Sequence, residues 1–210
     1  MGTGGAVPPH PLLLTGGPAA GKTTTARALA DGLPRAACIE VDDLRQLVRS
    51  GAAAPWEGSE GRARQALGAE NAALLAQRFD QAGFAVVVTD VVTRRTLELY
   101  RRILPGIAVV RLVVTETEAR RRAAGRPLLL TPREFAWLHR DQREPLAVDH
   151  ELDVTTLGVE EQVRAVRRIW GGRARLTPGS RARRVPRRVP VSGCGGGVRW
   201  CGWRRAGRAR

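Results

Sequence analysis

The clearest chemical spacing in this sequence lies in residues 16 to 23. Gly16, Gly21, Lys22 and Thr23 match the pattern G-x-x-x-x-G-K-[ST]. Glycines let the backbone bend so that successive N–H groups and a helix N-terminus can meet anionic phosphate oxygens. The threonine hydroxyl can bind Mg²⁺. We therefore expect ATP to bind along Gly16, Gly17, Pro18, Ala19, Ala20, Gly21, Lys22, Thr23 and Thr24, with Thr23 on the metal.

Lys22 is the only lysine in a chain that has 34 arginines. If basic positions were filled at random from this usage, the lysine would fall here about one time in 35. An ammonium on a flexible stem can follow the terminal phosphates of a nucleotide, which the wider guanidinium does less well. The placement of Lys22 therefore supports a nucleotide-binding loop.

Three aspartates lie near the carboxyl ends of predicted strands, at the edge where open α/β sheets bind ligands. Asp42 and Asp43 follow one strand, and either could take the proton from an attacking hydroxyl or simply cap the next helix. Asp90 ends the run VVVTD, so we expect it to hold Mg²⁺ directly or through water. Capping of the next segment is the alternative role for Asp90.

Apolar runs alternate with helical patterns along the chain. The strands and helices that they predict must position the phosphate loop and the aspartates. Strands are predicted at 10–16, 36–41, 83–92, 106–114 and 150–156. Helices are predicted at 22–33, 42–51, 62–81, 94–103, 117–124, 132–143 and 159–170. The pattern predicts an α/β fold, a three-layer α/β/α sandwich with a five-stranded, mainly parallel sheet, over residues 11 to 170.

Charge is distributed unevenly along the chain. Residues 171–210 contain 12 arginines and no acid, so they carry +12 of the formal net charge of +15. This Arg-, Gly- and Pro-rich tail lacks apolar periodicity, so we expect it to be disordered, and residues 1–10 to be flexible. The tail could bind nucleic acid, but a solvated appendage is the favoured interpretation. No run is long enough to span a bilayer, which favours a cytoplasmic protein, as a monomer or small homodimer.

These pieces together resemble the small P-loop kinases that include chloramphenicol phosphotransferase, zeta-toxin-like kinases and the kinase domain of bacteriophage polynucleotide kinase, proteins often labelled AAA family ATPase. The resemblance rests on GGPAAGKTT, VDDLRQLV, VVVTDVV, TEARRRAAGRP and HELDVTT. It covers about residues 11 to 170 and implies a P-loop NTPase fold that uses ATP and Mg²⁺.

The resemblance also implies roles for individual residues. Asp42 would be the general base, with Asp43 as its rival, and Arg45 would help to hold the acceptor or the transferring phosphate. A lid around 120–145 would bring Arg122 and Arg126 to the transferred phosphoryl group alongside Lys22. The segment 153–158 would lie near the adenine.

The implied activity is transfer of the ATP γ-phosphate to a hydroxyl of a small-molecule acceptor. Two alternatives stay open. One is a nucleotide-dependent switch or ATPase that has no small-molecule acceptor, and the other is a polynucleotide 5′-hydroxyl kinase. The sequence does not identify the acceptor, because the segment from Trp56 to Arg78 that should shape its pocket matches no substrate-specific pattern.

Overall fold

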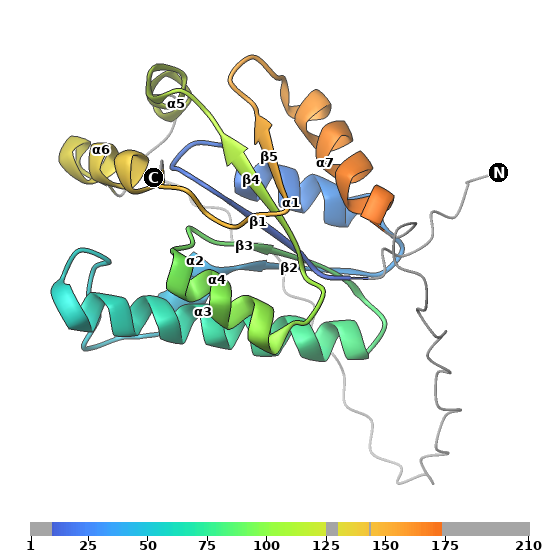
Figure 1. Ribbon diagram of the computed structural model, residues 1–210, viewed down its shortest axis with the longest axis horizontal. Helices are drawn as coiled ribbons and strands as arrows, with labels where there is room; N and C mark the ends of the chain where they lie inside the picture. Colours follow the sequence, from blue (N-terminus) through green and yellow to red (C-terminus); the bar gives the residue numbers. More distant parts are fainter. Residues whose placement is uncertain (1–9, 125–129, 143, 174–210) are drawn as a thin grey trace, which may run out of the picture. The chain divides into compact units, whose positions relative to one another are not determined.

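Strands and helices alternate through the described part of the chain, which is residues 10–124, 130–142 and 144–173 of a computed structural model (Figure 1). The strands are β1 (Leu12–Gly16), β2 (Ala36–Glu40), β3 (Ala85–Thr89), β4 (Ala108–Val113) and β5 (His150–Asp153). The helices are α1 (Lys22–Asp31), α2 (Val41–Arg45), α3 (Gly58–Gln81), α4 (Arg94–Ile103), α5 (Glu116–Ala123), α6 (Pro132–Asp141) and α7 (Val159–Arg173).

The five strands form one sheet in the order β2-β3-β1-β4-β5, and every pairing is parallel. β1 lies at the centre, where Leu13 pairs with Val88 of β3 and Val109 of β4. Parallel strands buried on both faces are continuously apolar, which is why LLL and AVVV predicted them so clearly. The predicted α/β fold with a parallel sheet is confirmed.

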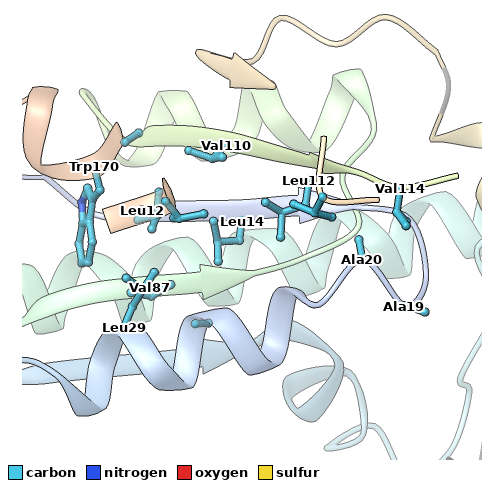
Figure 2. Packing of buried hydrophobic residues seen from close by; sticks show 14 of the residues in the cluster. Leu12, Leu14, Ala19, Ala20, Leu29, Val87, Val110, Leu112, Val114 and Trp170 are labelled. Carbon is cyan, nitrogen blue, oxygen red and sulfur yellow. The ribbon is translucent and has the colours of Figure 1, made fainter. Parts of the chain in front are cut away.

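Helices cover both faces of this sheet, as Figure 1 shows. Leu12 and Leu14 point to one face and pack with α1 and α7, where Leu29 and Trp170 belong to the same buried cluster (Figure 2). Leu13 points to the other face and packs with α3 and α4. Side chains alternate along a strand, so three consecutive leucines supply both cores.

The helices differ from the prediction on either side of the loop between α2 and α3. α2 ends at Arg45, whereas the pattern predicted a helix to residue 51. α3 begins at Gly58, four residues earlier than predicted. Glycine disfavours helix interiors, but a Cβ at Gly61 would lie 2.1 Å from the carbonyl oxygen of Ala54. Glycine is therefore needed there for the loop to approach the helix.

The two ends of the described domain lie together. The indole Nε1 of Trp170 donates to the carbonyl oxygen of His10 at 2.9 Å. α7 continues to Arg173, past its predicted end at residue 170. The predictions for residues 1–9 and 174–210 lie outside the described residues. None of the described helices is long and apolar enough to cross a membrane.

Candidate active site

The phosphate loop, residues 16–23, turns sharply between β1 and α1. Its backbone has positive φ angles at Gly16 (137°), Ala19 (57°) and Gly21 (84°). A Cβ at Gly16 would lie 2.2 Å from the carbonyl oxygen of Leu112 on β4. Glycine is therefore required at Gly16 both by conformation and by the close approach of the neighbouring strand. The turn brings the predicted phosphate-binding residues to the N-terminus of α1, where the helix dipole favours an anion.

Lys22 is the first residue of α1, and its ammonium folds back over the phosphate loop. Nζ donates to the carbonyl oxygens of Gly16 at 2.8 Å and Gly17 at 2.9 Å. These bonds hold the positive charge against the loop that is predicted to receive the phosphates. A phosphate bound there would form stronger hydrogen bonds with the Lys22 ammonium than these neutral carbonyls do, because both groups are charged. The ammonium could therefore turn from the carbonyls to the phosphate.

Thr23 contacts a carboxylate that the sequence had not singled out. Its hydroxyl donates to Oε2 of Glu40 at 3.0 Å, and Glu40 is the last residue of β2. Arg27 of α1 donates from Nε to the other oxygen, Oε1, at 2.6 Å. The Glu40 side chain is largely buried, whereas that of Arg27 is exposed. A hydroxyl and a carboxylate therefore stand together beside the phosphate loop.

A buried carboxylate fixes the arginine that contacts Asp42. Arg45 donates from Nη1 to Oδ1 of Asp42 and from Nη2 to Oδ1 of Asp90, both at 2.8 Å. The Asp42 side chain is 79% exposed, whereas that of Asp90 is fully buried. The structure thus brings together all three of these predicted site residues, whereas the Asp43 side chain is exposed. Of the two candidate bases, Asp42 is the one that Arg45 contacts.

The other partners of Asp90 explain how a fully buried carboxylate is accommodated. Oδ2 accepts from the Tyr100 hydroxyl at 2.9 Å, and Oδ1 also accepts from the backbone N–H of Val91 at 2.8 Å. Burial raises the pKa of Asp90, while Arg45 and Tyr100 oppose that shift. Burial and the adjacent Asp90 raise the pKa of Tyr100 well above its usual value, so the phenol stays a donor. Asp90 is therefore an anchor that orients Arg45.

A cavity of about 620 Å³ opens on the other side of the phosphate loop. Its walls come from the loop at Ala19 and Gly21, from α5 at Arg121 and Arg122, and from the segment 155–159 that follows β5. Arg122 anchors that segment, because its Nη2 donates to the carbonyl oxygen of Val154 at 2.6 Å and its Nε to Glu118 at 2.7 Å. The cavity adjoins the segment expected to lie near the adenine.

Comparison with known proteins rests on structure. No protein-family profile matches the sequence, and no curated protein is recognisably similar to it. A gluconokinase from Sinorhizobium meliloti 1021 superimposes with a TM-score of 0.59 and 22% identity, over 80% of this chain and 94% of that one. Shikimate kinase from Acinetobacter baumannii, in complex with shikimate, gives 0.55 and 22%, over 76% and 92%. A sugar kinase from Janibacter sp. gives 0.58 and 20%, over 77% and 93%.

The chain has the fold of the small P-loop kinases. This agrees with the resemblance that the motifs indicated, and the match extends over nearly the whole length of each neighbour. In this fold, three features lie at the carboxyl edge of the parallel sheet: the phosphate loop, the Asp42 network and the large cavity.

Thr23 and Glu40 lie together beside the phosphate loop, and their oxygens could hold a magnesium ion. Mg²⁺ prefers oxygen ligands and keeps several waters, so one hydroxyl and one carboxylate suit it. No group of three or more His, Cys, Asp or Glu side chains in the described chain could hold a metal alone. Both oxygens of Asp90 accept protein hydrogen bonds, and its side chain is fully buried. A metal role for Asp90 stays a prediction.

The predicted lid is described only in part. Arg126 lies outside the described residues, so its role stays a prediction. α5 and α6 flank the gap, and Arg122 of α5 is the predicted lid arginine that the structure places against a ligand-sized cavity. On α6, the buried ring of His139 faces the phosphate loop, since a Cβ at Gly17 would lie 3.5 Å from its Nε2. α6 therefore approaches the phosphate loop.

Sequence reasoning missed three residues that shape the site. Glu40 was taken as an ordinary strand residue, although its spacing from Asp42, E-x-D, was visible. Tyr100 on α4 and Gln162 on α7 carried no local signal. The Gln162 amide donates to the carbonyl oxygen of Ala20 at 3.1 Å and to Thr25 Oγ1 at 2.7 Å, which ties α7 to the phosphate loop and α1.

Proposed function

We propose that this protein is an ATP- and Mg²⁺-dependent kinase that transfers the γ-phosphate to a hydroxyl of a small molecule. The observation that carries the proposal is the exposed carboxylate of Asp42, held by Arg45 at the same sheet edge as the phosphate loop. Such a reaction needs a loop that binds the phosphates of ATP and an oriented carboxylate that takes the proton of the acceptor hydroxyl. Structural neighbours named for gluconate, shikimate and sugar phosphorylation give further support.

In the proposed reaction, the acceptor hydroxyl oxygen forms a bond to the γ-phosphorus while the bond from that phosphorus to the β–γ bridging oxygen breaks. Asp42 receives the hydroxyl proton, and ADP leaves. Arg45 donates to Oδ1 of Asp42, and the side chain is 79% exposed, so the carboxylate is accessible to the acceptor. Lys22 neutralises charge on the phosphates, and positioning with charge neutralisation supplies most of the catalysis.

Thr23 and Glu40 would hold the magnesium ion, which when bound neutralises phosphate charge and fixes the phosphate geometry. Oε1 of Glu40 already accepts from Arg27 and Oε2 from Thr23, so a bound magnesium ion would take the place of the Thr23 hydrogen bond. Arg122 would support the adenine side through the segment it anchors, and Arg126 remains a candidate for the transferring phosphoryl group.

Two other functions remain as alternatives. A switch or ATPase would use water as the acceptor and would not need Asp42 as a base for a second substrate. A polynucleotide 5′-hydroxyl kinase would use the same chemistry on a larger acceptor, and the net charge of +15 favours contact with nucleic acid. The oriented Asp42 carboxylate supports a kinase over a switch.

The test measures ATP consumption by the full chain with Mg²⁺ against pooled acceptors: nucleosides, sugars, sugar acids, aminoglycosides, aryl alcohols and a 5′-hydroxyl oligonucleotide. Lys22→Ala, Asp42→Asn and Asp43→Asn are measured beside it. We expect one pool to stimulate turnover and Lys22→Ala to abolish the stimulation. Asp42→Asn should lower kcat by roughly 10²–10⁴-fold, the contribution of a general base, with ATP affinity unchanged.

Asp43→Asn is the matched control, because it removes the same charge one residue away from the Arg45 contact. Its kcat should stay within about threefold of the parent, since an exposed carboxylate at that range is screened by solvent. ATP turnover that no pool stimulates and that Asp42→Asn leaves unchanged would instead identify the switch or ATPase. Stimulation by the oligonucleotide pool alone would identify the polynucleotide kinase.

A further inference from the structure

Helix α3 reverses the usual pattern of a surface helix. The residues that it buries are all small: Gly61, Gly68, Ala69, Ala72, Ala73 and Ala76. Its exposed large apolar side chains are between 38% and 49% accessible to solvent: Leu67, Leu74, Leu75 and Phe79. A surface helix ordinarily turns its apolar stripe towards the core and its polar residues towards solvent. The packing of this domain therefore does not account for the outward leucines of α3.

The outward leucines belong to one apolar surface. Eight large apolar side chains are exposed in the described chain; four belong to α3, and a fifth, Leu47, is 74% exposed. A groove of about 310 Å³ brings Leu47 and α3 together, and its lining is Leu44, Leu47, Asn71, Leu74, Leu75 and Arg78. Scattered apolar side chains are normal on a surface, but a contiguous patch with a polar rim marks an interaction site. We call this surface the leucine face: Leu47, Leu67, Leu74 and Leu75.

Charged residues flank the leucine face at equal distances from Leu74. Glu70 lies four residues before Leu74, and Arg78 lies four residues after it. Residues four apart are neighbours on a helix surface, so both charges border the exposed leucine. Both side chains are exposed, and the structure gives Arg78 a neutral partner, because its Nη1 donates to Oε1 of Gln81 at 3.0 Å. One negative and one positive charge therefore stand on opposite sides of Leu74.

A two-fold axis at Leu74 would make these charges complementary. In two antiparallel copies of α3 related by such an axis, each residue before Leu74 faces the residue equally far after it in the other copy. Glu70 of each copy would then face Arg78 of the partner subunit, and the two Leu74 side chains would meet at the centre. Two-fold interfaces are self-complementary, and opposite charges across an interface fix its register.

We propose that the leucine face is the interface of a homodimer, in which two copies of α3 pack antiparallel across a two-fold axis at Leu74. The dimer goes beyond the proposed kinase function and does not depend on it, because no residue of the leucine face takes part in the proposed reaction. Charge permits the contact between the domains: residues 1–170 carry only +3 of the formal net charge, so their mutual repulsion is weak.

The size of the leucine face sets the expected affinity. α3 has 24 residues, so it is about 36 Å long and, at 10–12 Å wide, offers roughly 400 Å² to a partner. Standard specific interfaces bury about 800 Å² on each side. We therefore expect a weak dimer, with a dissociation constant of about 1 μM or higher.

Sedimentation velocity of the full chain tests the dimer directly. We expect the average mass to rise from that of one chain towards that of two between about 1 and 200 μM, a range that spans the expected affinity. Leu74→Glu places two carboxylates together at the axis and should keep the protein a monomer throughout, because facing like charges oppose association. Leu74 is 49% exposed, so the variant should fold, and circular dichroism checks this.

Exchanging the two charges tests the symmetry of the dimer. Glu70→Arg or Arg78→Glu alone turns both opposite-charge contacts into like-charge contacts, and each should raise the dissociation constant about tenfold, the scale of two surface ion pairs reversed. The two substitutions combined restore opposite charges, so the dissociation constant should return to within about threefold of the parent. The residues three and four positions from Glu70 and Arg78 are uncharged, so ion pairs within one helix do not mimic this result.

Arg62→Glu is the matched control for the charge exchange. It reverses one exposed charge on α3, but the position equally far after Leu74 lies beyond Gln81, where α3 ends. A reversed charge without a facing residue is screened by solvent, so the dissociation constant should change by less than about twofold.

The outcomes decide both the interface and its symmetry. A parent that remains a single chain at about 200 μM would overturn the proposal. A dimer that Leu74→Glu leaves intact would also overturn it, because the contact would then lie on another surface, such as the Arg-rich tail. Weakening by both single exchanges without recovery in the combined variant would overturn the two-fold axis at Leu74. Recovery would support the proposal whether or not any acceptor is phosphorylated, so the dimer and the kinase stand or fail separately.

Discussion

The phosphate loop and the Asp42–Arg45–Asp90 network are two halves of one candidate site, held in place by different means. The phosphate loop is set by the backbone of consecutive residues, with positive φ angles at Gly16 and Gly21 and a strand too close to allow a Cβ. The network is set by side chains from α2, from α4 and from the residue after β3, which meet around one buried carboxylate. The first half should therefore be sensitive to added atoms, and the second to lost charges.

The largest expected effect removes the buried carboxylate. Asp90→Ala leaves the Arg45 guanidinium without its buried partner, and we expect about 3–5 kcal/mol of lost unfolding free energy, the cost of breaking a buried ion pair. Tyr100→Phe is the matched control: it removes only one hydrogen bond to the same carboxylate and should cost about 1–2 kcal/mol. Urea titration measures both. Equal losses in the two variants would show that the ion pair does not dominate this half.

The next effect concerns the phosphate loop. Gly16→Ala places a Cβ 2.2 Å from the Leu112 carbonyl oxygen at a φ of +137°, so we expect a loss of about 3 kcal/mol from strain and overpacking. Gly17→Ala adds the same methyl group at the next residue, where the nearest atom of His139 is 3.5 Å away, and should cost under about 1 kcal/mol. Thermal unfolding of both variants compares them. Similar midpoints would contradict a loop fixed by close backbone approach.

The smallest effect concerns the ion pairs of Glu118 with Arg121 and Arg122, beside the large cavity. Hydrogen bonds from Arg121 and Arg122 lower the pKa of Glu118 to about 2, below its ordinary value of 4.5. A depressed carboxyl pKa stabilises the fold above pH 4.5, and that contribution disappears as the pH falls towards 2. The melting temperature of the parent should therefore exceed that of Glu118→Gln by a small margin at pH 6, and the difference should shrink between pH 4.5 and 2. A difference that does not depend on pH would mean that Glu118 acts through packing.

The two halves also differ in how far the sequence predicts them. The residues of the phosphate loop are consecutive in the sequence, so its glycines and the single lysine were enough to predict where it lies. The network joins residues far apart in sequence, and the choice of Arg45 as the partner of Asp90 depends on α2 packing against α3 at Gly68, where a Cβ would lie 3.1 Å from Arg45 Nε. Periodicity and strand ends carry no information on such a contact.

The helix boundaries show the same limit. The central strands β1 and β3 were located because parallel strands buried on both faces are apolar throughout, although the predicted range 83–92 runs past β3 at both ends. The start of α3 was predicted too late, because Gly61 is typical of a loop until its contact with the Ala54 carbonyl is known. Gln162 could not be assigned from sequence at all, since its partner Thr25 lies 137 residues earlier in the chain.

The hydrogen bond between Trp170 and the His10 carbonyl oxygen has a practical consequence for protein engineering. Because residues 10 and 170 meet at 2.9 Å, a short peptide could join them into a continuous chain. New ends could then be opened in the exposed turn at residues 50–52, between α2 and α3. Such a circular permutant would carry its termini in the loop between α2 and α3, so a reporter could be fused there without interrupting the phosphate loop.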